Sequence, residues 1–195
     1  MNKIQDFVSR EIFTKLIEFK ELLLKWNKTI NLISAKTSND IMNRHVLDSL
    51  QLLPLIKKES KVIDLGSGAG FPAIILSIAG IHHITLIESD SRKAAFLIQA
   101  SKISSNNIRV INDRIENIEN LQCDIITSRA FAELDSIFKY SSKIEVKNKF
   151  LLHKGAGYKN EIAEAEKHWL FNKTVHDSIT SETGKILEIT DLKRK

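Results

Sequence analysis

The chain has 195 residues, 43% of them hydrophobic and 27% charged, which suits one α/β domain with an extension. Its one cysteine, Cys123, excludes a disulfide within the chain, and the apolar neighbours of Cys123 predict a buried thiol. The net charge of +5 is compatible with a polyanionic partner, but a lysine-rich soluble surface explains it equally well. Because the sequence has no basic leader and no run of about 18 apolar residues, we expect a cytoplasmic protein without membrane contact.

Two helices are predicted in the first part of the chain, the first of them amphipathic. Apolar residues recur at intervals of three and four through 7–26, which predicts the first helix. The second is predicted over 40–53, with Ser38 or Asn39 as its N-cap and Pro54 at its end.

From residue 61 onward, short runs rich in Val and Ile alternate with helix-length segments. This alternation predicts a parallel sheet with crossover helices. We expect strands at 62–63, 84–87, 110–111, 125–126 and 150–152, and helices at 72–79, 92–101, 134–141 and 160–169. Two further runs flank a turn rich in Ser, Thr and Gly and predict that the sheet ends in an antiparallel pair, at 171–176 and 185–189.

These elements predict a single domain over 1–195, in which residues 1–58 form a helical cap on a core of 59–195. No repeat or linker divides the chain. The basic residues 193–195 are expected to form a frayed, solvated tail.

The strongest functional signal lies in residues 62–72, where a strand runs into a glycine-rich turn and then into a helix. Three glycines follow the strand at alternate positions, Gly66, Gly68 and Gly70. Dinucleotide binders space their glycines differently to seat a pyrophosphate, and here Phe71 takes the place of the last glycine. The turn therefore suits a ligand without phosphates. Asp64 could hold a cationic amino group, directly or through water, as the methionine end of S-adenosylmethionine requires.

Acidic residues after the next two strands are candidates for binding the ribose and the base of a nucleoside. Glu88 follows the glycine-rich turn by about 20 positions, where this architecture places an acid that binds ribose hydroxyls. An exposed glutamate at the strand end is the alternative. After the third strand, Asp113 or the Ile115-Glu116 step could bracket an adenine ring, while Asn112 or Asp113 could equally cap a helix.

Arg129 ends the fourth strand, in the crevice where open α/β sheets bind ligands, and we expect it to face the reaction centre. Neither the Asn/Asp-Pro-Pro-aromatic tetrapeptide of amino-group methylases nor the nucleophilic cysteine of carbon-5 pyrimidine methylases occurs at this point. A ring nitrogen with a free lone pair needs no base, so we predict catalysis by orientation and electrostatics. Because of Lys154, methylation of a ribose 2′-hydroxyl remains an open alternative.

A second group of basic residues precedes the first strand. Arg44 and His45 share an edge of the second predicted helix, and Asp48 lies one turn after Arg44. Either Arg44 pairs with Asp48 within the helix, or the basic residues contact phosphate or substrate at the rim of the pocket. Lys154 adds a cation near the same mouth. The remaining histidines lack metal-ligand spacing, so no metal site is predicted at His82, His83, His168 or His176.

Motifs along nearly the whole chain closely resemble those of the ribosomal RNA small subunit methyltransferase G family, also called the glucose-inhibited division protein B family. They are Lys25-Trp26-Asn27-Lys28 with Asn31-Leu32, Arg44-His45-x-x-Asp48-Ser49, the segment from Asp64 to Pro72, Ser128-Arg129-Ala130 and Lys154-Gly155. The glycine-rich turn marks the wider superfamily, whereas the Arg-His and Ser-Arg-Ala elements in this order point to the one family.

The resemblance implies a Rossmann-like fold dependent on S-adenosylmethionine, and methyl transfer from this cofactor to N(7) of a guanine in 16S rRNA. It implies cofactor contacts at Gly66, Phe71, Ile115, Glu116 and Arg129. Together with the residue patterns above, the expected cofactor site also includes Asp64, Gly68, Gly70 and Glu88. No catalytic base is expected; Arg129 and Lys154 would orient the substrate, and the RNA would contact Arg44, His45, Arg114 and Lys154.

Three positions depart from the family pattern: Ile33, Ala73 and His153 stand where the family usually has Thr, Gly and Leu. We expect the partner to be 16S rRNA, either naked or within the 30S subunit. We also expect the enzyme to be a monomer. Two other functions remain open: a methyltransferase acting on a protein or small molecule, and a nucleoside-binding ribosome assembly factor without catalysis.

Overall fold

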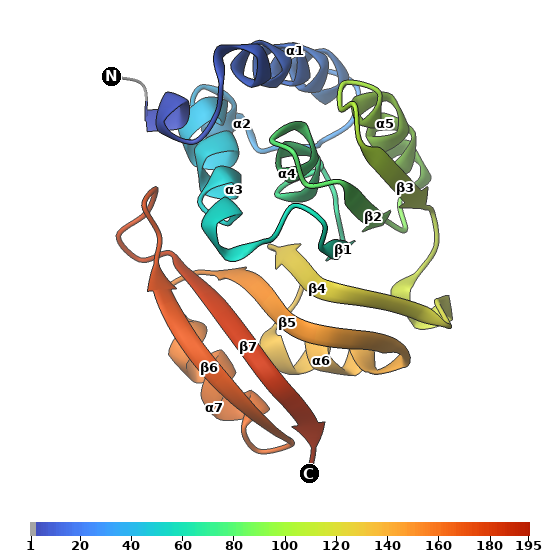
Figure 1. Cartoon of the computed structure of the whole chain (residues 1–195), viewed down its shortest axis with the longest axis vertical. Coiled ribbons are helices and arrows are strands. Elements are labelled where there is room, and N and C mark those ends of the chain that lie inside the picture. The colour runs from blue at the N-terminus through green and yellow to red at the C-terminus, as the bar shows by residue number, and fades with distance from the viewer. Residues whose placement is uncertain (1–2) are drawn as a thin grey trace.

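A seven-stranded sheet with the strand order β3-β2-β1-β4-β5-β7-β6 forms the centre of the protein (Figure 1). A computed structural model describes residues 3–195. The strands are β1 (Lys61–Leu65), β2 (His83–Ile87), β3 (Asn107–Ile111), β4 (Leu121–Arg129), β5 (Ile144–Lys154), β6 (Trp169–Asp177) and β7 (Lys185–Arg194). Strands β1 to β5 are parallel, and β7 runs antiparallel to both β5 and β6. The predicted parallel sheet with an antiparallel end is confirmed.

Helices cover both faces of this sheet. They are α1 (Arg10–Asn27), α2 (Ala35–Ser38), the π-helical segment Met42–Leu47, α3 (Asp48–Leu50), α4 (Ala73–Ile78), α5 (Ser91–Ser101), α6 (Leu134–Tyr140) and α7 (Tyr158–Ala165). Figure 1 shows α1, α4 and α5 on one side and α6 and α7 on the other. No helix within residues 3–195 is both long enough and apolar enough to cross a bilayer.

Alternate residues of the central strands divide the core into two apolar clusters. Val62, Ile125 and Leu151 belong to the cluster beneath the N-terminal helices. Their neighbours in sequence face the other way and pack with α6 and α7: Ile63, Ile126 and Leu152. Because side chains alternate across a strand, a sheet covered on both faces needs the continuous apolar runs seen in the sequence.

The cap packs directly on the core. Ser9 caps α1, since its hydroxyl accepts a hydrogen bond from the Ile12 amide at 3.3 Å. Leu16, Phe19 and Leu23 follow at helical spacing, are fully buried, and share one apolar cluster with α4 and α5. The cap and the core therefore have a common hydrophobic interior.

The helix predicted over 40–53 is shorter and differently built. It starts with the π-helical segment Met42–Leu47, continues into α3 and ends at Leu50. The predicted caps are wrong, because Ser38 is the last residue of α2 and Asn39 follows that helix as its C-cap.

Two predictions at the C-terminus are also wrong. The helix expected over 160–169 ends at Ala165, because Trp169 enters β6 and its indole nitrogen donates to Asp135 at 2.9 Å. Residues 193–195 do not fray, because β6 provides a hydrogen-bonding edge: Arg194 pairs with Trp169, and the Lys195 amide donates to the carbonyl of His168 at 3.0 Å. Their side chains nevertheless remain exposed.

The cysteine prediction is confirmed. Cys123 is 1% exposed within β4. Burial raises the pKa of its thiol to about 12, so the thiolate is not formed at neutral pH.

Candidate active site

A cavity of about 630 Å³ opens beside the glycine-rich turn that follows β1. Register brings the carboxyl ends of the neighbouring strands to the same level, with Leu65 opposite Ile87 and Asp64 opposite Thr127. The chain continues from β1 to β2 on one side and resumes at β4 on the other, which is where such sheets bind ligands. The cavity brings together most of the predicted residues, namely His45, Gly66, Gly68, Phe71, Glu88, Arg114, Ile115, Glu116 and Arg129.

Glycine is needed at two positions of the turn for different structural reasons. Gly66 has φ +66°, and a Cβ added there would lie 2.2 Å from Phe131, so only glycine allows that ring to approach. Gly70 has φ +83° and packs against Ile74, where an added Cβ would lie 2.6 Å from that side chain. Gly70 is not among the residues that line the cavity, so its contact with a cofactor stays a prediction.

Glu88 is held with its carboxylate at the cavity wall. The side chain is buried, and its two oxygens accept hydrogen bonds from the amides of Gly68 at 2.8 Å and Asp90 at 2.9 Å. Each carboxylate oxygen has further lone-pair capacity, so Glu88 can still accept from two ligand hydroxyls. Asn112 supports this arrangement by donating to the Glu88 carbonyl at 2.8 Å.

The turn after β3 provides a third wall. Ile115 is buried and Glu116 is exposed, and both line the cavity together with Asp113. One Asp113 oxygen accepts from the Arg114 amide and the Asn117 side chain, each at 2.7 Å. Asp113 thus stabilises the local turn, although the short 3₁₀ turn Ile115–Asn117 has no side-chain cap.

Asp64 lies beneath the turn and is 1% exposed. One of its oxygens accepts from the Thr127 hydroxyl at 2.7 Å, while Oδ2 is buried without a hydrogen-bond partner among residues 3–195. Burial raises the pKa of Asp64 to about 7. A nearby cation would favour the charged carboxylate and satisfy the second oxygen. Asp64 does not line the cavity, so the predicted contact with a cofactor ammonium group stays a prediction.

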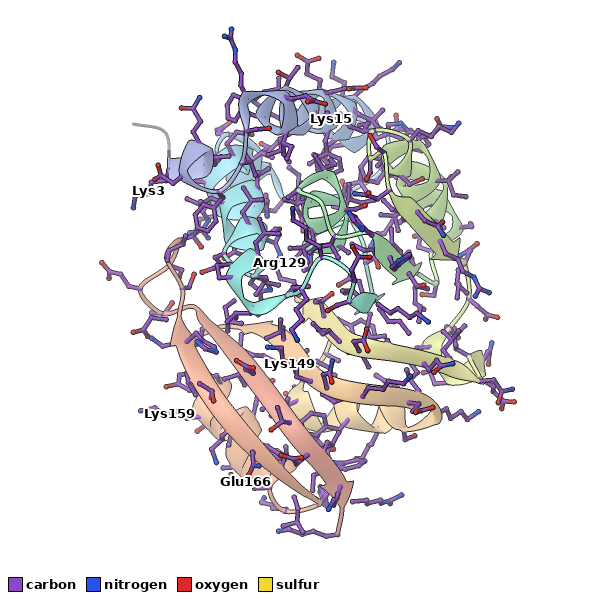
Figure 2. All side chains as sticks on the ribbon, viewed as in Figure 1. Lys3, Lys15, Arg129, Lys149, Lys159 and Glu166 are labelled. Atoms are coloured by element: carbon purple, nitrogen blue, oxygen red, sulfur yellow. The ribbon has the colours of Figure 1, made fainter. Side chains whose placement is uncertain are left out.

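Arg129 lies where the cap meets the end of β4 (Figure 2). Its Nη1 donates to Asp48 Oδ2 at 3.0 Å, and its Nη2 donates to His45 Nδ1. The guanidinium carbon lies 5.0 Å from the centre of the Phe71 ring, and the His45 ring stacks on the same phenyl at 4.8 Å. The planar guanidinium is therefore fixed by directed contacts on several sides.

His45 is neutral in this arrangement. Since Nδ1 accepts from Arg129, the proton of the imidazole lies on Nε2, which is buried and has no partner among the described residues. Burial, followed by the charge of Arg129, lowers the pKa of His45 to about 4.

The pairing of Arg44 with Asp48, one of the two alternatives drawn from the sequence, is wrong. Asp48 turns toward β4 and pairs with Arg129, which removes it from the edge of its own helix. The Arg44 side chain is exposed, and the backbone carbonyl of Arg44 accepts from Arg129 at 3.3 Å.

A second cavity, of about 330 Å³, shares walls with the first at Thr37, His45, Arg129 and Ala130. Its other walls carry the cations Arg44, Lys154 and Lys185 and the hydroxyls of the loop between β6 and β7, Ser178, Thr180, Ser181 and Thr183. The Thr180 hydroxyl donates to Asp48 at 2.7 Å and so anchors this loop to the cap. The chemistry of these walls suits an anionic ligand rich in hydrogen-bonding groups.

Lys154 is committed to contacts within the protein. Its side chain is 6% exposed, and its Nζ donates to Glu161 at 2.6 Å and to the carbonyl of Ala132 at 2.8 Å. The same Glu161 oxygen accepts from the Leu134 amide at 3.0 Å. Lys154 and Glu161 thus hold the part of the loop after Arg129 that leads into α6. The expected contact of Lys154 with RNA stays a prediction.

His153, one of the departures from the family pattern, also belongs to this network. Its Nε2 donates to the Asp48 carbonyl at 2.9 Å, and burial lowers the pKa of its ring. Ala73 is fully buried at the start of α4, and Ile33 lines the first cavity.

Sequence reasoning missed several residues of the first cavity. Phe131 lies over Gly66, and Tyr140 lies 5.7 Å from the Phe131 ring, measured between ring centres. The segment 32–34 closes the wall beside the cap because the Asn27 side chain accepts from the amides of Leu32 and Ile33, both at 2.9 Å. The Asn27…Leu32 motif was a signal for this contact. Nothing in the sequence indicated that Phe131 would fold back over the turn.

Comparisons with known proteins agree with this geometry. The sequence profile of the family described as rRNA small subunit methyltransferase G matches residues 12–190. A ribosomal RNA small subunit methyltransferase G of Rickettsia felis is 54% identical over 186 residues, covering 95% of this chain and 96% of that protein.

Among solved structures, a TehB-like S-adenosylmethionine-dependent methyltransferase from Corynebacterium glutamicum has a TM-score of 0.60 at 14% identity and covers 89% of this chain and 98% of its own. A ribosomal protein L11 methylase from Lactobacillus delbrueckii has a TM-score of 0.58 at 18% identity, covering 76% and 77% of the two chains. The fold is thus confirmed as the Rossmann-like fold of S-adenosylmethionine-dependent methyltransferases. The chain belongs to the rRNA small subunit methyltransferase G family.

Proposed function

We propose that the chain transfers the methyl group of S-adenosylmethionine to N(7) of a guanine in 16S rRNA. One observation carries this proposal: the cavity beside the glycine-rich turn and the cation-lined cavity meet at Arg129 and His45. A cofactor in the first cavity and a nucleotide in the second would face each other across this shared wall.

The residues present fit the cofactor. A volume of about 630 Å³ lies within the range of small-molecule sites, which is roughly 300–1,000 Å³. Glu88 offers its carboxylate to the ribose hydroxyls, and the unpartnered Oδ2 of Asp64 calls for a positive group such as the cofactor ammonium. Ile115 offers an apolar surface to an adenine ring.

When bound, S-adenosylmethionine supplies an electrophilic methyl group on a sulfonium. The chain itself must hold the guanine so that the lone pair of N(7) lies in line with that methyl. Arg129 is the residue best placed to orient the base or the cofactor, because it borders both cavities and is fixed by Asp48 and His45.

No side chain need remove a proton from N(7). The adjacent His45 is neutral and engaged through Nδ1, and Arg129 remains a cation at neutral pH. The site therefore supports catalysis by orientation and by fixed charge rather than by a general base.

On the substrate side, Arg44 offers an exposed cation without an acidic partner among residues 3–195, whereas Lys185 is paired with Asp177. The β6–β7 loop offers hydroxyl donors. Arginine and lysine bind phosphates, and serine and threonine hydroxyls add directed hydrogen bonds. These groups support the binding of the target nucleotide through its phosphate, with the base turned toward Arg129.

The 16S rRNA of a deletion strain, with and without this chain, provides the test. Mass spectrometry of digested 16S rRNA should detect 7-methylguanosine at one site only when the chain is expressed. Loss of the modification with an Arg129→Ala variant should follow. Restored ribosome assembly without any methylation would identify a non-catalytic assembly factor instead, and methylation confined to protein would identify another substrate class.

We further propose that the chain acts as a monomer and as one methyltransferase domain, whose cap and core share one apolar cluster. Its substrate would be 16S rRNA, free or within the 30S subunit, which implies a cytoplasmic site of action. Sedimentation of the purified protein at micromolar concentration should give the monomer mass.

A further inference from the structure

Strands β5 and β7 separate along part of their length. They pair only from Phe150 opposite Ile189 to Lys154 opposite Lys185. Beyond Ile189, β7 pairs with β6 alone, with Asp191 at φ +55° and a shift in the pairing register between Leu170 and Asn172. Figure 1 shows the two strands diverging, with the first part of β5 at the right of the view and the last part of β7 at the bottom, near the C-terminus. The gap between them is a groove of about 600 Å³, referred to below as the splayed groove.

The splayed groove carries a strong excess of positive charge. Aromatic residues form part of its surface, Phe138, Phe150 and Trp169, and the cations around it are Lys139, Lys147, Lys149, Lys193 and Arg194. Its one acidic residue, Asp191, already accepts hydrogen bonds from Asn172 and Thr190. By contrast, acidic and basic residues are balanced around the cofactor cavity, with Glu88, Asp113 and Glu116 against Lys93, Arg114 and Arg129.

Three of these cations have no acidic partner among residues 3–195. Lys139 pairs with Asp135, and Lys149, labelled in Figure 2, pairs with Glu188. Lys147, Lys193 and Arg194 are exposed and form no ion pair within the described part of the chain. Uncompensated cations around one groove repel one another, and a bound polyanion relieves that repulsion.

The splayed groove lies far from the site of methyl transfer. Its unpaired cations lie toward the start of β5 and the end of β7, whereas the second cavity borders the opposite ends of these strands at His153 and Lys185. At about 3.3 Å per residue, Lys147 lies roughly 20 Å from His153 along β5, and Lys193 lies roughly 26 Å from Lys185 along β7. One ligand that reaches both must be a large polyanion.

We propose that the splayed groove binds the phosphate backbone of rRNA at a distance from the methylated base. The proposal rests on the proposed function, because that function makes rRNA the partner. Phosphate contacts of this kind fix the register and orientation of a nucleic acid without reading its sequence. The groove would thus help to present one guanine to Arg129, and it would make the affinity for a large RNA exceed that for a short one.

The test compares two variants of equal net charge. In the groove variant, Lys147, Lys193 and Arg194 are replaced by alanine; in the control variant, alanine replaces Lys25, Lys58 and Lys102, which are exposed and lie on other surfaces. Filter binding of transcribed 16S rRNA is measured from low to high salt. Each lost phosphate contact reduces the logarithmic salt slope by about 0.7–0.9, so the groove variant should lose about 2–3 units of slope.

The control variant should keep more of the slope than the groove variant, and both should bind S-adenosylmethionine as the wild type does in calorimetry. Equal slopes for the two variants would overturn the proposal. A groove variant that binds naked 16S rRNA normally but no longer binds 30S subunits would also overturn it, because the groove would then contact a ribosomal protein. The single variant Lys147→Ala, with an expected loss of about one unit of slope, keeps the test valid if the triple groove variant misfolds.

The outcomes separate this proposal from the proposed function. If the wild type forms 7-methylguanosine and the groove variant keeps its salt slope, the groove inference alone fails. If the wild type binds rRNA with a groove-dependent slope but methylates nothing, the methyltransferase proposal fails and the groove inference stands.

Discussion

At the scale of single residues, two carboxylates near the cofactor cavity have opposite environments. The oxygens of Glu88 accept hydrogen bonds from two backbone amides, whereas Asp64 keeps one buried oxygen without a partner in residues 3–195. Amide donors hold Glu88 ready to accept ligand hydroxyls, while burial makes a neutral Asp64 more favourable until a cation arrives.

Glu88→Ala should weaken the binding of S-adenosylmethionine by roughly 1.5–3 kcal/mol, which is typical of hydrogen bonds to a charged group. Calorimetry on the folded variant measures it. Glu88→Gln serves as the matched control, because its amide oxygen keeps one acceptor for the Gly68 amide. Unchanged cofactor affinity in the alanine variant would remove Glu88 from the ribose site.

Asp64 should make cofactor binding depend on pH. Its pKa in the folded protein, about 7, exceeds the ordinary 3.8. Its contribution to the stability of the free protein is therefore present below about pH 4 and is lost as the pH rises through about 7. A bound ammonium group has the opposite preference and requires the carboxylate. Affinity for S-adenosylmethionine should then rise with pH, by up to roughly tenfold per unit below pH 7.

Calorimetry between pH 5.5 and 8.5, in buffers of different ionisation enthalpy, checks this expectation. The wild type should release a proton on binding near pH 6, whereas Asp64→Asn should bind weakly and without proton release. A wild-type affinity that stays constant across this range would show that the cofactor does not contact Asp64.

Arg129→Lys should slow methyl transfer although it keeps the charge. Lysine cannot reproduce the directed contacts with Asp48 and His45, and a displacement of about 1 Å at a reacting centre can cost roughly 10²-fold in rate. Single-turnover transfer to 30S subunits at saturating cofactor measures the chemical step. A wild-type rate in Arg129→Lys would remove Arg129 from the reaction centre.

The same assay from about pH 6 to 9 tests the absence of a base. The pKa of His45, about 4, lies well below this window, so the single-turnover rate of the wild type should stay level. A log-linear rise with pH would contradict the base-free mechanism.

At the scale of the elements, the sequence patterns predicted those strands and turns whose formation depends on neighbouring residues in the chain. The β1 run and the glycine-rich turn were predicted because buried parallel strands and left-handed turns leave plain signals. The partner of Asp48 could not be predicted in this way, because it depends on how β4 meets the cap. The β6–β7 turn was predicted, but its contact with Asp48 was missed, since this contact joins residues more than 130 positions apart.

The fate of the C-terminal residues shows the same limit. A run of three basic residues is typical of a solvated tail, and their side chains are indeed exposed. Only the presence of a neighbouring edge, β6, gives their backbone a hydrogen-bonding partner. The composition of residues 193–195 predicts that their side chains are exposed, but it cannot predict that β6 lies beside their backbone.

The loop between β4 and α6 provides a prediction at this scale. If Lys154 holds the loop through Ala132 and Glu161, then Lys154→Gln and Glu161→Gln should impair methyl transfer to similar extents. The double variant should be no worse than either, with a coupling of about 0.5–3 kcal/mol in the transfer rate. Glu119→Gln, which breaks the exposed pair with Lys143, is the control and should cost at most about 1 kcal/mol of stability.

Salt dependence separates this tether from a direct contact with RNA. Both tether variants should keep the wild-type salt slope of rRNA binding. A slope reduced by nearly one unit in Lys154→Gln alone would instead assign the Lys154 ammonium to a phosphate.

At the scale of the whole molecule, the cap and the core share one apolar cluster. Phe19 of α1 is fully buried and contacts both the glycine-rich turn, through Phe71 at 5.5 Å, and α5, through Phe96 at 6.2 Å, measured between ring centres. A cap that folded independently would not need these contacts. The residues that border the cofactor cavity therefore depend on the cap for their support.

Phe19→Ala should accordingly destabilise the whole chain by about 3–5 kcal/mol, the usual cost of removing a buried phenylalanine side chain. The chain has two tryptophans, Trp26 in the cap and Trp169 in β6, which makes each half separately observable. In the single-tryptophan variants Trp26→Phe and Trp169→Phe, fluorescence and far-UV circular dichroism should report the same urea midpoint. Phe19→Ala should lower that midpoint equally for both probes, because a shared interior unfolds as one unit. A shift confined to the Trp26 signal would show that residues 1–58 form a separate folding unit.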